Sequence, residues 1–250
     1  DPTAERKLLL AISTASGLTA VDVTAGQVVW HGFEDDLSYR CVGSPVLGGG
    51  LLFFGCGEGG GGKLLIAARP GDEQQGPQEI YRLQQGVSYV PTPVVAGDLV
   101  YCSAAYEVGA GLVRVTKTGD GFEATEVWRK PKELLNHWST PVVKDGYLFG
   151  LFGHAPHKTG PLKCIELATG KEMWSHTGFG PGGLILAGDR LIVLGDQGQL
   201  VLAEAKPFAY KELSRQQAVQ GKCWSTPALS NGRLYVRSAR EGACFDLNAR

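Results

Sequence analysis

STPVVKDGYLF, residues Ser139 to Phe149, is one copy of a phrase that recurs along this chain of 250 residues. The phrase is a small or polar residue, proline, two apolar residues, a turn, and then an aromatic or aliphatic strand. It returns as GSPVLGGGLLF (Gly43 to Phe53), PTPVVAGDLVY (Pro91 to Tyr101), STPALSNGRLY (Ser225 to Tyr235) and, in degenerate form, LILAGDRLIV (Leu184 to Val193). Self-similarity at a nearly fixed period indicates a repeat architecture. The spacings are 48, 48, 43 and 43 residues between the aligned positions Pro45, Pro93, Pro141, Leu184 and Pro227.

Each copy of the phrase predicts a β-hairpin. Asp145-Gly146 and Asn231-Gly232 are strong two-residue turns, because both central residues accept positive φ. The same slot is filled elsewhere by Gly49-Gly50, Gly97-Asp98 and Gly188-Asp189. The proline is expected early in the first strand, where a missing N–H is tolerated.

A second phrase follows each hairpin, and its clearest copies are AVDVTAGQVVW (Ala20 to Trp30) and CIELATGKEMW (Cys164 to Trp174). It predicts a strand, a tight turn at Gly26 or Gly170, and a strand that ends in tryptophan. Asp22 and Glu166 are expected to accept backbone N–H bonds from the turn. Trp30 and Trp174 are expected to pack against the next unit. Eroded copies end at Trp128 and Tyr81, and Cys244 to Leu247 is only the first half.

Each unit therefore has four strands in about 40–50 residues, which is the period of a β-propeller blade. The pattern A-x-D-x-x-T-G-x-x-x-W resembles the tryptophan-docking repeat of PQQ-type quinoprotein propellers, a superfamily with non-enzymatic relatives of the BamB type. The resemblance covers essentially the whole chain. It implies an all-β propeller of four-stranded antiparallel blades, and we expect residues 1–250 to form one domain.

The number of strands predicts an incomplete ring. The four strands of a blade are counted from the centre of the propeller outward. Six pairs of second and third strands are expected, but only five segments connect them. Closing the ring would therefore need one more outer (fourth) strand and one more inner (first) strand. The pairs are expected to start at Leu8, Leu51, Leu99, Leu148, Leu191 and Leu234. Because folded proteins avoid open strand edges, we predict that the chain is the C-terminal part of a larger propeller. The resemblance implies eight blades, and a six-bladed ring with a frayed seam is the alternative.

The connections between blades carry the candidate binding residues. In propellers these connections lie around the channel mouth, on the same face as the loops between second and third strands. The bulky polar or aromatic residues just before the hairpin phrase are Arg40, Tyr89, His137, Trp138, Lys222 and Trp224. Cys41, Tyr89, His137 and Cys223 share one position, four residues before the aligned prolines. These side chains could converge on a ligand or partner, or they could plug the mouth and pack against neighbouring blades.

Catalysis by PQQ is the less favoured interpretation. The resemblance implies that quinoprotein dehydrogenases hold PQQ against a disulfide between adjacent cysteines, beside a Ca²⁺ site of Glu, Asn and Asp and a catalytic Asp. This chain has no adjacent cysteines, and Asp35-Asp36 is expected to be a solvated turn. We expect no catalytic residue, metal or cofactor, with PQQ binding as the alternative. The favoured function is a binding or scaffold module for a protein or cell-envelope partner, and the alternative is a PQQ-dependent alcohol dehydrogenase.

Composition excludes some partners and leaves others open. The formal net charge of −1 gives no electrostatic reason to expect binding to nucleic acid or an anionic membrane. No apolar run approaches the ~20 residues of a membrane span. The sequence opens with Asp1-Pro2-Thr3 and shows no signal-peptide pattern. The resemblance alone implies a bacterial protein outside the cytoplasm, periplasmic or secreted, and the sequence predicts no oligomeric state.

The six cysteines suit an oxidising compartment by their even number. Cys41 and Cys56 could form a disulfide if the hairpin turn lay at Gly48-Gly49. The repeat alignment places that turn one residue later, and free buried thiols are the alternative.

The stretch GCGEGGGGKLL, Gly55 to Leu65, matches both G-x-G-x-x-G and G-x-x-x-x-G-K. A phosphate-binding loop would need Ser or Thr where Leu64 stands, and a helix after it. The apolar run from Leu64 predicts a strand instead, so the glycines are expected to form a flexible loop. His154 and His157 are likewise assigned to an exposed loop and not to a metal site.

Overall fold

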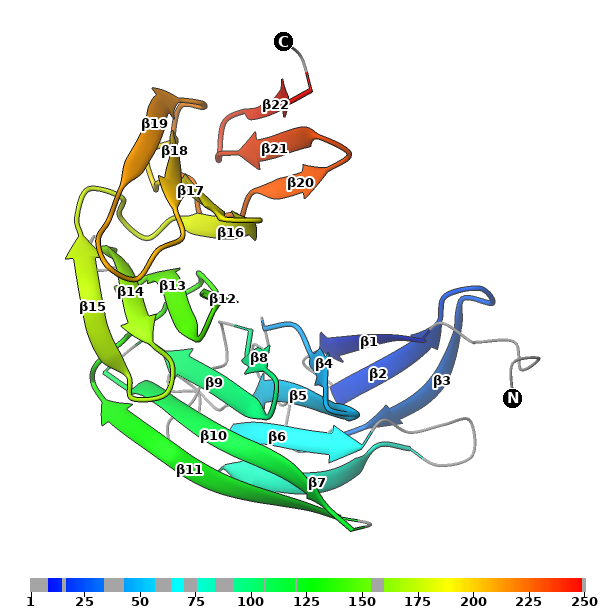
Figure 1. Ribbon diagram of the computed structural model, residues 1–250. Helices are drawn as coiled ribbons and strands as arrows, with labels where there is room; N and C mark the ends of the chain where they lie inside the picture. The colour runs from blue at the N-terminus through cyan, green and yellow to red at the C-terminus, as the bar shows by residue number, and fades with distance from the viewer. Residues whose placement is uncertain are drawn as a thin grey trace. The chain divides into compact units, whose positions relative to one another are not determined.

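All regular secondary structure in the described residues is β-strand. The computed structural model describes residues 9–14, 17–33, 43–56, 64–69, 76–83, 92–105, 107–119, 121–153 and 160–248, with the backbone alone for 9–14, 55–56, 64–69 and 81–83. Its strands form six antiparallel sheets, in each of which consecutive strands are neighbours (Figure 1). This is the succession of short meanders that the repeat predicts.

The first three sheets follow the chain from its start. They are β1 (Leu9–Thr14), β2 (Gly17–Asp22) and β3 (Gln27–Gly32); β4 (Val46–Gly48), β5 (Leu51–Cys56), β6 (Leu64–Arg69) and β7 (Gln78–Leu83); and β8 (Val94–Ala96), β9 (Leu99–Ala104), β10 (Gly109–Thr118) and β11 (Gly121–Pro131).

The remaining three sheets continue the same order. They are β12 (Val142–Lys144), β13 (Tyr147–Leu151), β14 (Leu162–Glu166) and β15 (Lys171–His176); β16 (Gly183–Ala187), β17 (Arg190–Leu194), β18 (Gln199–Glu204) and β19 (Glu212–Gln217); and β20 (Ala228–Ser230), β21 (Arg233–Arg237) and β22 (Gly242–Asp246).

Contacts divide the chain into two compact units. Unit 1 is Asp1–Ala104 with Val113–Glu126, and unit 2 is Ala105–Leu112 with Val127–Arg250. The sheets β1–β3 and β4–β7 belong to unit 1, and the last three sheets belong to unit 2. The single domain over residues 1–250 and the incomplete ring both stay predictions.

The hairpin turns lie where turn chemistry predicts them. Lys144 pairs with Tyr147, which leaves Asp145 and Gly146 in the turn at φ 50° and 80°. Asn231 and Gly232 have φ 49° and 72° in the turn between β20 and β21. Side chains at these positions must tolerate the left-handed region, which explains the Asp-Gly and Asn-Gly pairs.

The turn of the β4–β5 hairpin bears on the cysteine prediction. Gly48 pairs with Leu51, so the turn is Gly49-Gly50, as the repeat alignment predicts. The alternative turn at Gly48-Gly49, which would bring Cys41 opposite Cys56, is therefore wrong. The side chains of both cysteines lie outside the described residues.

The repeated prolines differ slightly from the prediction. They stand directly before the strands β4, β8, β12 and β20 and not inside them, at Pro45, Pro93, Pro141 and Pro227. Because proline has no N–H to donate, the ladder begins with the residue after it.

A β-bulge recurs in the second phrase. The register between β2 and β3 shifts between Ala20 and Val21, and Ala20 pairs with Trp30. The register between β14 and β15 shifts between Cys164 and Ile165, and Cys164 pairs with Trp174. The bulge changes the direction of the outer strand near its end. The small residue of the phrase pairs with the tryptophan in both sheets.

The tryptophans that end the second phrase, Trp30, Trp128 and Trp174, differ in their hydrogen bonds. Two of them donate a hydrogen bond to the turn of a neighbouring sheet. The indole Nε1 of Trp128 donates to the Leu167 carbonyl at 2.8 Å, and that of Trp174 donates to the Lys206 carbonyl at 2.9 Å. Trp30 is buried, and its indole N–H has no acceptor among the described residues. In the next sheet, residues 70–75 of the segment between β6 and β7 lie outside the described part of the chain.

The acidic residue of the second phrase makes two different contacts. Asp22 Oδ1 accepts from the backbone N–H groups of Thr24 (2.8 Å) and Ala25 (3.0 Å), as predicted. Glu166 differs, because its carboxylate accepts from the Thr169 hydroxyl at 2.5 Å. The extra methylene of glutamate carries the carboxylate past the backbone of the turn.

The best-filled core of unit 2 lies between the sheets β12–β15 and β16–β19. Phe149 and Leu162 from the first sheet are buried with Leu184, Val193 and Val201 from the second. These side chains alternate along their strands with residues of the opposite face. The two sheets therefore hold the connections at their ends in fixed positions.

Candidate functional site

Four of the six predicted binding residues form one continuous stack. The ring centroids of His137 and Trp138 are 3.8 Å apart, and those of Trp138 and Trp224 are 4.1 Å apart. The Lys222 ammonium lies 4.0 Å from the centre of the Trp224 ring. We call these four residues the aromatic–lysine stack. The other two predicted residues, Arg40 and Tyr89, lie outside the described residues.

The stack is assembled from separate connections of unit 2. His137 and Trp138 belong to the β11–β12 connection, and Lys222 and Trp224 belong to the β19–β20 connection. The β15–β16 connection supports them, because Trp138 Nε1 donates to the Pro181 carbonyl at 3.0 Å. The preceding residue is fixed as well, since the buried Asn136 amide donates to the Leu151 carbonyl at 2.9 Å.

Loops between second and third strands adjoin these connections, as predicted for one face. Gly153 N–H donates to the Leu135 carbonyl at 2.6 Å, which ties the loop after β13 to the β11–β12 connection. Ala239 N–H donates to the Lys222 carbonyl at 2.9 Å, which ties the loop after β21 to the base of the stack. Backbone hydrogen bonds therefore fix the stack in place.

The stack presents only part of itself to solvent. His137 is 7% exposed, whereas Trp224 is 44% exposed and Lys222 is also exposed. A cation over an exposed tryptophan contributes about 0.5–1 kcal/mol. The buried His137 and the partly buried Trp138 thus hold an exposed tryptophan, Trp224, whose ring also carries the Lys222 ammonium.

A hollow of about 290 Å³ opens next to Trp224. It is lined by Lys222, Trp224, Ser225, Arg237, Ser238 and Ala239. Both charged residues are cationic, and the Ser238 hydroxyl donates to the Gln220 carbonyl at 2.7 Å. The arrangement suits an anionic or amide group. Sequence reasoning missed Arg237 and Ser238, although Arg237 ends β21 and Ser238 begins the loop after it, one of the loops expected on this face.

A match to a protein-family model identifies the family of this repeat. A family model described as outer membrane protein assembly factor BamB matches residues 1–176 and 158–250. The chain belongs to this family. The predicted fold class, an all-β propeller of four-stranded antiparallel blades, is confirmed.

Solved structures agree on the fold of this BamB-family chain. BamB from Moraxella catarrhalis has a TM-score of 0.66 at 18% identity, over 94% of this chain and 68% of that one. A europium-containing methanol dehydrogenase has a TM-score of 0.63 at 13% identity, over 94% of this chain and 60% of that one. Hsv2p from Kluyveromyces lactis has a TM-score of 0.59 at 12% identity, over 93% and 74%. At such identities the likeness shows the fold alone. No sequence among the curated proteins matches this chain.

The expectation that this BamB-family chain holds no PQQ or metal ion stays a prediction. No three His, Cys, Asp or Glu side chains lie close enough in the part that the structure describes to hold a metal ion. The sequence has no adjacent cysteines. Asp35, Asp36, His154 and His157 lie outside the described residues, so their assignments to loops stay predictions.

The described thiols are free, and three of them are buried. Cys102, Cys164 and Cys223 are buried and Cys244 is exposed. Burial raises the pKa of the Cys164 thiol to about 12. Burial raises the pKa of the Cys223 thiol as well, with a smaller contribution from the charges of Asp196 and Glu241. These buried cysteines are therefore protonated packing residues.

Strands flank the glycine-rich stretch on both sides. Strand β5 (Leu51–Cys56) precedes it, and strand β6 (Leu64–Arg69) follows Lys63 where a phosphate-binding loop would need a helix. The prediction of a strand from Leu64 is confirmed, while residues 57–63 themselves lie outside the described part.

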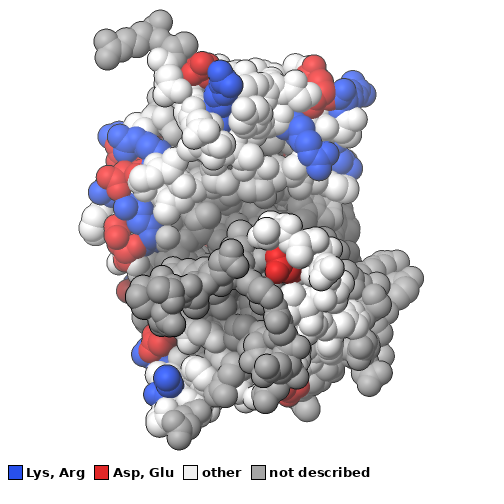
Figure 2. Space-filling view, turned by 90° about the vertical axis from the view of Figure 1, so that its right-hand side faces the viewer, with Lys and Arg blue, Asp and Glu red and all other residues white. Residues whose placement is uncertain are grey.

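Charged side chains of both signs are mixed on the visible surface. On the face in Figure 2, Lys and Arg side chains of the described residues are interspersed with Asp and Glu. Within the described residues there is no helix long and apolar enough to cross a membrane.

Proposed function

We propose that this chain is a non-catalytic binding module of the bacterial cell envelope that docks a protein partner on the aromatic–lysine stack. The observation that carries the proposal is the position of Trp224. Its indole is 44% exposed yet fixed by Trp138 on one side and Lys222 beside it. Binding energy at protein interfaces concentrates in such pre-ordered tryptophan, tyrosine and arginine side chains.

The family supports the location and the class of partner. Its description names an assembly factor for outer membrane proteins. We therefore place this chain outside the cytoplasm, in the periplasm or secreted, and propose a protein or cell-envelope component as its partner. A propeller serves this purpose well because short connections at the strand ends share one face and tolerate varied residues.

The hollow beside Trp224 suggests how a partner is held. A partner side chain can lie against the indole face while a carboxylate or amide meets Lys222 and Arg237. A truncated tryptophan at the centre of an interface typically costs at least about 2 kcal/mol. We expect Trp224→Ala to weaken partner binding by about 30-fold or more on that basis.

Site-specific photo-crosslinking in cells tests the proposal. Benzoylphenylalanine replaces Trp224, and the control replaces Phe208, which is 87% exposed in the turn between β18 and β19. These positions lie at opposite ends of β19. We expect one cross-linked envelope protein at position 224, its loss on Lys222→Glu, and no such adduct at 208. No adduct at 224, or the same adduct at both positions, would sink the proposal.

The structural likeness to a methanol dehydrogenase keeps a second candidate in view. A PQQ-dependent oxidoreductase would bind PQQ together with Ca²⁺ or europium. Calorimetric titration of the protein with PQQ and either ion distinguishes the two functions. We expect no binding heat, and tight binding would favour the dehydrogenase.

A further inference from the structure

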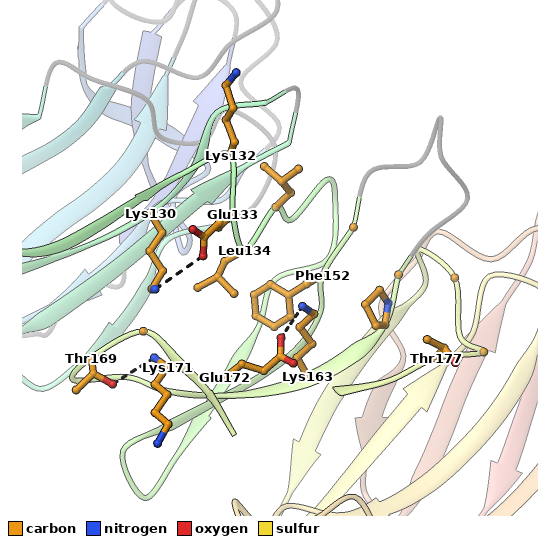
Figure 3. A pocket seen from close by; sticks show the side chains of 17 residues that line it. Lys130, Lys132, Glu133, Leu134, Phe152, Lys163, Thr169, Lys171, Glu172 and Thr177 are labelled. Atoms are coloured by element: carbon orange, nitrogen blue, oxygen red, sulfur yellow. Dashed lines mark hydrogen bonds and ion pairs between the residues drawn. The ribbon is translucent and has the colours of Figure 1, made fainter. Parts of the chain in front are cut away.

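We infer that a lysine-lined groove in unit 2 binds an extended acidic segment of a partner protein. The groove has a volume of about 870 Å³ and is lined by 17 residues, none of which belongs to the aromatic–lysine stack. In Figure 3 it lies between the segment 130–135 and the strands β14 and β15. It is a second surface, independent of the one proposed above.

The charges of the groove do not balance. Four lysines and two glutamates line it: Lys130, Lys132, Lys163 and Lys171 with Glu133 and Glu172. Lys163 Nζ lies 2.6 Å from Glu172 Oε2, and Lys130 Nζ lies 3.8 Å from Glu133 Oε2. Both glutamates are thereby used. Lys132 and Lys171 keep no carboxylate within ion-pair distance among the described residues, which leaves two positive charges.

The two remaining lysines favour a long occupant over a single ion. In Figure 3, Lys132 and Lys171 lie on opposite sides of the groove, and their side chains point away from each other. One carboxylate or phosphate cannot satisfy both at once. A polypeptide with several acidic residues can, because its side chains follow the groove.

The floor between the lysines is partly apolar. Leu134, Leu135, Phe152 and Pro161 line it, and Phe152 is buried. Gly153, Gly160, Gly170, Gly178 and Gly180 also line the groove and present backbone without side chains. An extended segment places alternate residues on opposite faces, so acidic residues can meet the lysines while apolar ones meet the floor.

The groove is held open by the packing of the repeat. Trp128 Nε1 donates to the Leu167 carbonyl, which fixes the end of β11 against the turn after β14. Lys130 then passes over Gly170, where an added Cβ would lie 2.6 Å from Lys130 Cε. The Thr169 hydroxyl accepts from Lys171 N–H at 3.2 Å. A site that is already ordered loses less conformational entropy when it binds.

Fluorescence anisotropy with a labelled peptide of alternating glutamate and leucine tests the inference. We expect the whole chain to bind this peptide at least ten-fold more tightly than the matched glutamine–leucine and lysine–leucine peptides. Binding should weaken as salt rises, because exposed charges are screened over about 10 Å at 0.1 M ionic strength. A glutamate–serine peptide should bind less well, since it leaves the floor uncovered.

Charge reversal locates the site. Lys132→Glu with Lys171→Glu should weaken binding at least ten-fold, since close charge pairs contribute strongly across interfaces. The control is Lys117→Glu, at an exposed lysine of β10 in unit 1, with an expected change below two-fold. All three lysines are exposed, and circular dichroism and melting check that the variants fold.

Three outcomes would overturn the inference. They are equal loss with Lys117→Glu, no binding of the acidic peptide at millimolar concentration, and tighter binding of a single-stranded oligonucleotide of similar length. Trp224→Ala should leave peptide affinity unchanged. Failure here therefore leaves the role of the stack untouched, and failure of the crosslinking test leaves the groove untouched.

Discussion

Gly26 and Gly170 provide a matched pair that isolates the energy of packing between successive sheets. Both have φ 68° in the same turn of the second phrase. Among the described residues, a Cβ at Gly26 would meet nothing within 4 Å. At Gly170 it would lie 2.6 Å from Lys130 Cε and 3.2 Å from Trp128 Cε2. The substitutions Gly26→Ala and Gly170→Ala therefore share the backbone strain and differ in the crowding.

The magnitudes follow from these two terms. An alanine in the left-handed region costs about 1–2 kcal/mol, and this is the whole effect expected for Gly26→Ala. Forcing a methyl group into a packed contact adds about 1–3 kcal/mol. The Lys130 stem can swing away, but the Trp128 ring is held by its hydrogen bond to Leu167. We expect Gly170→Ala to lower the free energy of unfolding by about 2–5 kcal/mol, from the sum of both terms.

Urea unfolding followed by tryptophan fluorescence measures the free energy of unfolding of both variants. The two values can be compared if the m-value is unchanged. If the two units unfold in separate steps, Gly26→Ala should move one step and Gly170→Ala the other. Lys130→Ala in the Gly170→Ala background should recover part of the loss, with a coupling of about 0.5–3 kcal/mol. Equal losses for the two glycine variants, or no coupling to Lys130, would refute the contact between the sheets.

Three further predictions concern single interactions. Trp128→Phe removes the indole donor to the Leu167 carbonyl and should lower the free energy of unfolding by about 1 kcal/mol, measured by urea titration at constant m. The Lys144 ammonium, 2.7 Å from Asp189 Oδ1, lowers the pKa of that carboxyl. The stabilisation by this ion pair should be fully present above the unfolded pKa of about 3.9. It should disappear as pH falls below that value and through the lowered pKa of the folded state. Melting curves of Asp189→Asn and the parent protein should therefore converge in acid. Burial raises the pKa of Cys164 to about 12, so mass spectrometry should find this thiol unlabelled at pH 8 until the protein is unfolded.

Local turn chemistry explains why the hairpins could be predicted from the sequence. A two-residue hairpin requires positive φ at one or both central positions. Asp145-Gly146 and Asn231-Gly232 satisfy that requirement without help from distant residues. The register then follows from the turn, as the pairing of Gly48 with Leu51 illustrates.

The stack could be predicted because it depends on the phase of the repeat. Trp138 and Trp224 both stand three residues before an aligned proline, Pro141 and Pro227. Positions of equal phase lie at equivalent strand ends, and the two rings come within 4.1 Å of each other. The hollow beside them was missed because Arg237 and Ser238 lie at the end of a second strand, a position that the alignment on the prolines does not cover.

Glu166 shows a different limit of pattern reasoning. It occupies the position of Asp22 in the phrase, yet it contacts the Thr169 hydroxyl and not the turn backbone. A sequence pattern that accepts either aspartate or glutamate does not specify the side-chain length that the turn requires. The contact depends on one methylene and on the residue three positions later.

The groove depends on departures from the repeat, and this is why sequence phase could not find it. Its lysines come from the end of β11, from the connection after it, and from β14 and β15, and no two of these segments share a position in the repeat. Strands β10 and β11 have 10 and 11 residues, whereas the other described strands have three to six. Because β11 is long, Lys130 reaches the turn of the next sheet and passes over Gly170. Function in repeat folds resides in sites grafted on a common frame, and here the long β11 hairpin provides the place for such a site.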